Sequence, residues 1–78
     1  MKLIVLNLPR DISEDDLGKL FETHGKVTVC DLVLDEKTGA SKGFGFVEMK
    51  DDHEAEIAIE ALNGSKLNKN KLRVKARD

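Results

Sequence analysis

Residues 42–49 have the sequence Lys-Gly-Phe-Gly-Phe-Val-Glu-Met, and this stretch constrains the fold more than any other part of the chain. Alternate side chains of a strand share a face, so Phe44 and Phe46 are predicted to stand side by side. Lys42 and Glu48 fall on that same face. Burying it would cost several kcal/mol per unpaired ion, against roughly 1.5 to 3 kcal/mol gained per buried ring. The sequence therefore predicts a strand whose two rings point outward, away from the core.

Strand and helix signals alternate along the rest of the chain. The predicted elements are a strand at 2–7, a helix at about 13–24, strands at 27–34 and about 42–49, a helix at about 52–62, a short extended piece at 65–67 and a last strand at about 71–76. This β-α-β-β-α-β order predicts an α+β protein of the ferredoxin-like, split βαβ kind. In that fold a four-stranded antiparallel sheet carries two helices on one face.

Capping residues define the ends of the predicted helices. Ser13 followed by Asp16 is typical of a capping box, and Gly25 is predicted to end the first helix in a left-handed turn. Asp51 or Asp52 is expected to cap the second helix, which carries an apolar stripe and ends at the Asn-Gly pair 63–64. In the last turn, at 68–70, Asn68 or Asn70 is predicted to supply any positive φ that is needed.

Length and composition favour one small globular domain, predicted to span residues 1–78. A length of 78 residues is predicted to leave no room for a second lobe that carries a site, and because a chain this short buries only about 60% of its unfolded surface, its core is expected to be compact. The apolar run at the start is broken by Asn7 and Pro9, and no cleavage site follows, so it is predicted to be a strand and not a signal peptide. One cysteine, Cys30, cannot form an internal disulfide, which agrees with a cytoplasmic protein.

Two segments resemble the signatures of a known family. Residues 42–49 match, except at Met49, the RNP1 motif of the RNA recognition motif family, and residues 3–8, Leu-Ile-Val-Leu-Asn-Leu, resemble its RNP2 motif. Ile4 stands where that family usually has a third aromatic residue. Further similarities extend over nearly all of the chain, and residues 43–49 and 74–77 resemble bacterial members that consist of a single such domain. The resemblance implies single-stranded RNA binding on the open sheet face, over two to four nucleotides.

The predicted outward face combines aromatic, aliphatic and charged side chains. The burial argument turns Lys2, Ile4 and Leu6 outward. The residues that it turns inward are Leu3, Val5, Val47, Met49, Leu72 and Val74. The resemblance adds Asp31 and Val33 to the outward face and places Cys30 and Leu32 inside. The candidate RNA-binding residues are Lys2, Ile4, Asp31, Val33, Lys42, Phe44, Phe46, Glu48, Arg73, Lys75 and Arg77. The rings are predicted to stack on bases, and Lys42 with the cations of the last strand to hold phosphates.

Charge is distributed unevenly, although the formal net charge is only −2. Ten of the fifteen acidic residues lie in or just before the two predicted helices, whereas residues 66–77 contain six basic residues and no acid. The chain is therefore predicted to be acidic on its helix side and basic along its last strand. A face of this kind can attract phosphate despite the negative total.

Catalysis finds no support in the sequence. His24, His53 and Cys30 fall on different predicted elements and lack metal-ligand spacing, and no phosphate-binding glycine loop is present. We therefore expect no enzyme activity, metal, cofactor, small-molecule substrate or membrane partner. Single-stranded DNA remains an alternative ligand. A module for protein interaction or weak homodimerisation, using the same sheet face or the helix face, is the alternative function.

Overall fold

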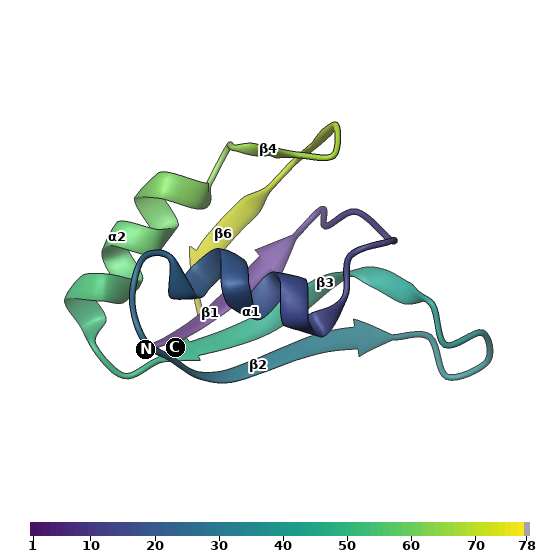
Figure 1. Cartoon of the computed structure of the whole chain (residues 1–78), viewed down its shortest axis with the longest axis horizontal. Coiled ribbons are helices and arrows are strands. Elements are labelled where there is room, and N and C mark those ends of the chain that lie inside the picture. Colours follow the sequence, from purple (N-terminus) through teal and green to yellow (C-terminus); the bar gives the residue numbers. More distant parts are fainter. Residues whose placement is uncertain (78) are drawn as a thin grey trace.

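The computed structural model describes residues 1–77 and places both helices on the same side of one antiparallel sheet (Figure 1). The elements are β1 (Lys2–Leu6), α1 (Glu14–Glu22), β2 (Val27–Leu34), β3 (Ser41–Met49), α2 (Asp52–Leu62), β4 (Lys66–Leu67), β5 (Asn70–Lys71) and β6 (Arg73–Ala76). The four-stranded sheet has the order β2-β3-β1-β6, and β4 and β5 form a separate small hairpin. The predicted ferredoxin-like fold is confirmed.

The helix starts follow from side-chain caps. The Asp16 amide donates to Ser13 Oγ at 3.1 Å and the Ser13 amide donates to Asp16 Oδ2 at 3.3 Å, which is the predicted capping box. At α2 the cap is Asp51, whose Oδ1 accepts from the amides of His53 and Glu54 at 2.8 and 3.1 Å. Each cap satisfies amides that have no partner within the helix.

The predicted left-handed turn at Gly25 is wrong. Helix α1 ends with Thr23 as its C-cap, and Gly25 is not among the residues with positive φ. The glycine is required for close packing instead, because a Cβ atom there would lie 2.6 Å from Glu54 Cβ and 2.8 Å from Met49 Cε. This contact brings the loop after α1 against α2 and β3, and the local sequence does not reveal it.

The hairpin between β4 and β5 turns through two residues with positive φ. Asn68 has a φ of 49°, as predicted, but Lys69 has a φ of 78°. Two positive φ values in a two-residue loop are the pattern of a type I′ turn, whose twist matches that of the strands. The predicted last strand is interrupted at Leu72, which lies between β5 and β6.

The Lys69→Gly variant is expected to be more stable than the wild type by about 0.5 to 1 kcal/mol, because glycine removes the steric strain of a left-handed residue. Thermal unfolding followed by circular dichroism measures this as a rise of a few degrees. Lys66→Gly is the matched control, since Lys66 lies in β4 with an ordinary φ and should lose stability. Equal destabilisation by both glycines would contradict the turn assignment.

The core lies between the helices and the inner face of the sheet. Its fully enclosed side chains include those predicted to face inward from β1, β3 and β6. The buried apolar residues are Leu3, Val5, Leu8, Ile12, Leu17, Phe21, Leu32, Val47, Met49, Ala55, Ala58, Leu62, Leu72 and Val74. Neither described helix is long and apolar enough to cross a membrane.

Candidate nucleic-acid interface

Strand pairing aligns outward side chains into rows across the sheet. In the central row Phe46 on β3 lies opposite Asp31 on β2 and opposite Ile4 on β1, which in turn lies opposite Lys75 on β6. Directly opposed residues have Cβ atoms about 4.5 to 5.5 Å apart, so these side chains are neighbours. One ring is therefore flanked by an acid on one side and by an aliphatic residue and a cation on the other.

Two further rows lie on either side of the central one. Phe44 lies opposite Leu6, which lies opposite Arg73. On the other side of the central row, Glu48 on β3 lies opposite Lys2 on β1. The Arg77 amide donates to the Lys2 carbonyl at 2.7 Å, which continues the pairing beyond β6. The register thus collects residues from the two ends of the chain on one surface.

The two outward rings are in contact with each other. The centroids of Phe44 and Phe46 are 6.0 Å apart and their planes meet at 86°, an edge-to-face arrangement, and both side chains are half-buried. Gly45 between them allows β3 to approach its neighbours, because a Cβ atom there would lie 2.6 Å from the Asp31 carbonyl oxygen and 3.0 Å from Leu17 Cδ2. The Phe-Gly-Phe sequence therefore presents two rings above a tightly packed backbone.

Arg77 lies over one of these rings. Its Cζ atom is 4.6 Å from the centroid of Phe46, a cation–π contact. Such contacts contribute about 0.5 to 1 kcal/mol at exposed sites. Phe46 therefore has a cation on its surface, placed there by the segment that follows β6.

A cavity of about 330 Å³ opens beside Phe46. It is lined by Lys2, Val29, Asp31, Phe46, Val47, Glu48 and Arg77. Val29 was not among the predicted site residues, and the residue is 38% exposed. Its odd-numbered position, shared with Asp31 and Val33, was the signal that could have identified it. The sequence of β2 obscures that signal because apolar residues occupy both of its faces.

Lys42 lies at the beginning of the same strand as the rings, and its side chain is exposed. Gly43, however, has a φ of 87°, and the β2–β3 register shifts between Leu32 and Leu34. Such an irregularity interrupts the simple alternation of faces on which the position of Lys42 was predicted. The places predicted for Lys42 and Val33 on the outer face therefore stay predictions. Val33 is half-buried and lies at the register shift itself.

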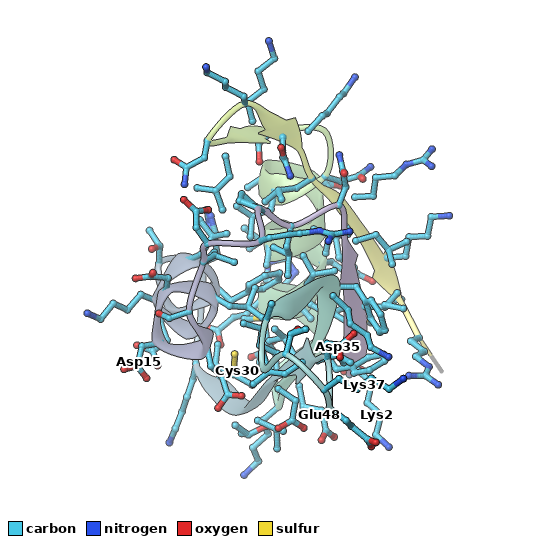
Figure 2. The ribbon with its side chains drawn as sticks, turned by 90° about the vertical axis from the view of Figure 1, so that its right-hand side faces the viewer. Lys2, Asp15, Cys30, Asp35, Lys37 and Glu48 are labelled. Carbon is cyan, nitrogen blue, oxygen red and sulfur yellow. The ribbon has the colours of Figure 1, made fainter. Side chains whose placement is uncertain are left out.

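Acidic and basic side chains separate as the sequence predicts. Figure 2 shows Asp15 pointing into solvent from α1, whereas Lys2 lies on the opposite side of the molecule, together with Glu48, one of the two acids predicted on the sheet face. The first turn of α1 also carries Glu14 and Asp16, where carboxylates favour the helix dipole. Arg73, Lys75 and Arg77 are exposed along β6 and just beyond it. The sheet face is consequently the more basic of the two faces.

Cys30 lies between α1 and the sheet (Figure 2). Its thiol is half-buried and lies 3.5 Å from the Glu14 carbonyl oxygen, to which it can donate. Burial, followed by the negative charge of Glu14, raises the pKa of Cys30 to about 11. The thiol is therefore protonated at neutral pH, which makes it a poor nucleophile.

A sheet that presents aromatic rings and cations on a surface free of helices defines a class of nucleic-acid-binding platform. The family model of the RNA recognition motif matches residues 3–73, and the chain belongs to this family.

Three known proteins illustrate the similarity. RNA-binding protein CP31B of the Arabidopsis thaliana chloroplast is 42% identical over 73 residues, covering 94% of this chain and 25% of that protein. The RbpA protein of Synechocystis is 46% identical over 65 residues, covering 83% of this chain and 64% of its own. A solved structure of an Sxl-lethal protein/RNA complex superposes on this chain with a TM-score of 0.92 and 36% sequence identity. The match covers 99% of this chain and 47% of the chain in that structure. The chain thus spans about a quarter of CP31B and under two thirds of RbpA.

Proposed function

We propose that residues 1–78 act as a single domain that binds a short stretch of single-stranded RNA across the outer face of the sheet. The observation that carries this proposal is the pair of half-buried rings, Phe44 and Phe46, 6.0 Å apart at the centre of a face bordered by cations. Every base has a π-face, so each ring can stack on one base. Membership of the RNA recognition motif family and the RNA-binding relatives support the same function.

Base stacking on Phe46 must compete with the Arg77 guanidinium. Stacking of a base on an aromatic side chain contributes about 1 to 3 kcal/mol, more than the 0.5 to 1 kcal/mol of an exposed cation–π contact. A base is therefore expected to displace Arg77 from the ring or to slide beneath it. The guanidinium then becomes available to a phosphate, where a charge-assisted hydrogen bond is stronger.

We assign phosphates to the cations of the proposed site. Four of them lie on or beside the sheet face, Lys2, Arg73, Lys75 and Arg77, and the fifth is Lys42, whose place beside the rings stays a prediction. Ile4 offers only apolar contact where other family members stack a third base, so the site is short and binding is weak. Asp31, Val33 and Glu48 complete the proposed RNA-contacting set.

Salt is expected to weaken the complex in a graded manner. If about three phosphates are neutralised, affinity falls roughly twentyfold between 50 and 200 mM salt, since each phosphate on a single strand contributes a slope of about −0.7. Fluorescence anisotropy of a labelled RNA pentamer over this range measures the slope. An affinity that does not change with salt would contradict phosphate contacts by these cations.

The same anisotropy titration tests the proposed function itself. Saturable binding of RNA supports it, and a DNA pentamer of matched sequence decides whether deoxyribose is also accepted. Failure of both oligonucleotides to bind at 50 mM salt would refute the proposal. Dissociation of a dimer on dilution, measured by sedimentation, would then favour the use of this face for self-association.

The proposed activity is binding without chemistry, in agreement with the RNA-binding relatives and with the protonated Cys30 thiol. We further propose a cytoplasmic location. Its relatives include a chloroplast protein and a cyanobacterial protein, so the location differs among them. Cell fractionation measures the location of this protein.

A further inference from the structure

Lys2 and Glu48 supply a donor and an acceptor side by side in the cavity that Phe46 also lines. They are register partners on β1 and β3, and both line the cavity of about 330 Å³ beside Phe46. Figure 2 shows the two side chains close together on the side of the sheet away from α1. Asp31, opposite Phe46 on β2, adds a second carboxylate to the same cavity.

The side chains of these charged groups make no polar contact within the part of the chain that the structure describes. Among residues 1–77 no ion pair or hydrogen bond involves the side chain of Lys2, Asp31 or Glu48. Lys2 and Glu48 lie opposite each other on the adjacent strands β1 and β3, but their side chains form no ion pair with each other. The hydrogen-bonding capacity of both side chains is therefore available to a ligand that stacks on Phe46.

An ionised carboxylate only accepts hydrogen bonds, and a lysine ammonium only donates them. Guanine is the base whose Watson–Crick edge presents two adjacent donors, N1–H and the N2 amino group, beside the acceptor O6. We propose that the cavity beside Phe46 selects guanine, with Glu48 accepting from N1–H and N2–H and Lys2 donating to O6. This inference rests on the proposed RNA binding and adds base selectivity at one position of that site.

The other bases match this arrangement less well. Uracil has one donor between two carbonyl acceptors, which the carboxylates of Glu48 and Asp31 would repel. Adenine and cytosine each offer one amino group next to a ring-nitrogen acceptor, so they can make one of the two bonds. Edge contacts of this kind, and not the stacking, distinguish bases in single-stranded RNA.

Four pentamers that carry one variable base among uridines test the inference. The guanosine pentamer is expected to bind about tenfold or more tightly than the all-uridine one, since a bidentate contact of this kind discriminates roughly five- to 150-fold. A fifth pentamer carries inosine, which keeps N1–H and O6 but lacks the N2 amino group. It should bind several-fold more weakly than the guanosine pentamer.

The Glu48→Gln variant replaces one acceptor oxygen by a donor without changing the size of the side chain. It is expected to reduce the guanosine preference to less than about twofold and to abolish the difference between guanosine and inosine. Glu56→Gln, an exposed position on α2, is the matched control and should keep both differences.

The outcomes separate the inference from the proposed function. Equal binding of all pentamers by the wild type, or an unchanged guanosine preference in Glu48→Gln, would overturn guanine selection while leaving RNA binding intact. Failure of every pentamer to bind would instead refute the proposed function. The inosine comparison uses only the wild-type protein, so the test holds even if a variant folds poorly.

Discussion

The Phe44→Ala variant is expected to bind single-stranded RNA about tenfold or more weakly than the wild type, because a stacking ring contributes about 1 to 3 kcal/mol per base. Its fold should change little. The Phe44 ring is half-buried on the outer face and is not part of the core between the sheet and the helices. Anisotropy with a labelled pentamer gives the affinity, and thermal unfolding gives the stability.

Phe44→Tyr is the matched control for this loss, since it keeps an aromatic ring at the same position and should retain most of the affinity. A Phe44→Ala protein that unfolds would show that the ring supports the core, and it would overturn the assignment of the outer face. A folded variant with undiminished affinity would remove Phe44 from the proposed site.

The Phe21→Ala variant is expected to lose a large part of the free energy of unfolding of the wild type. Phe21 lies on α1 with 0% of its side chain exposed, and the loss of a buried phenylalanine costs about 3 to 5 kcal/mol. A domain of this size has a total stability of about 4 to 12 kcal/mol at the usual range per residue. Urea unfolding followed by circular dichroism measures the loss, which should appear as a much lower midpoint.

The chain has three phenylalanines, so the same substitution tests both sides of the sheet. Phe21→Leu is the control for the core position, because it keeps much of the apolar volume and should fold. If Phe21→Ala retained wild-type stability, the core between α1 and the sheet would not be the one described. Opposite outcomes at Phe21 and Phe44 would show that one sheet face is structural and the other is available to ligand.

Periodicity and caps were sufficient to predict the helices and the inner face of the sheet. The bounds of α2 agree with the predicted 52–62, because Asp51 supplies a side-chain cap and the apolar stripe is regular. The inward set from β1, β3 and β6 follows from the cost of burying charge. Both features depend on residues close together in sequence, where pattern and physical cause coincide.

Features that depend on contacts between distant segments could not be predicted in the same way. The need for a glycine at position 25 comes from its close approach to Glu54. The cation–π contact of Arg77 with Phe46 depends on the strand pairing that continues beyond β6. The positive φ of Lys69 is imposed by the two-residue loop between β4 and β5. The opposed pair Lys2 and Glu48 emerges only from the register of two strands that are far apart in sequence.

The central claim is that the open sheet face, centred on its two rings, is where RNA binds. Titration of isotope-labelled protein with a short RNA, followed by the amide chemical shifts, tests it most directly. We predict that the largest shifts occur at Phe44, Phe46 and Arg73 and diminish as salt is raised. Shifts confined to α1 and α2, with the sheet residues unchanged, would contradict this account.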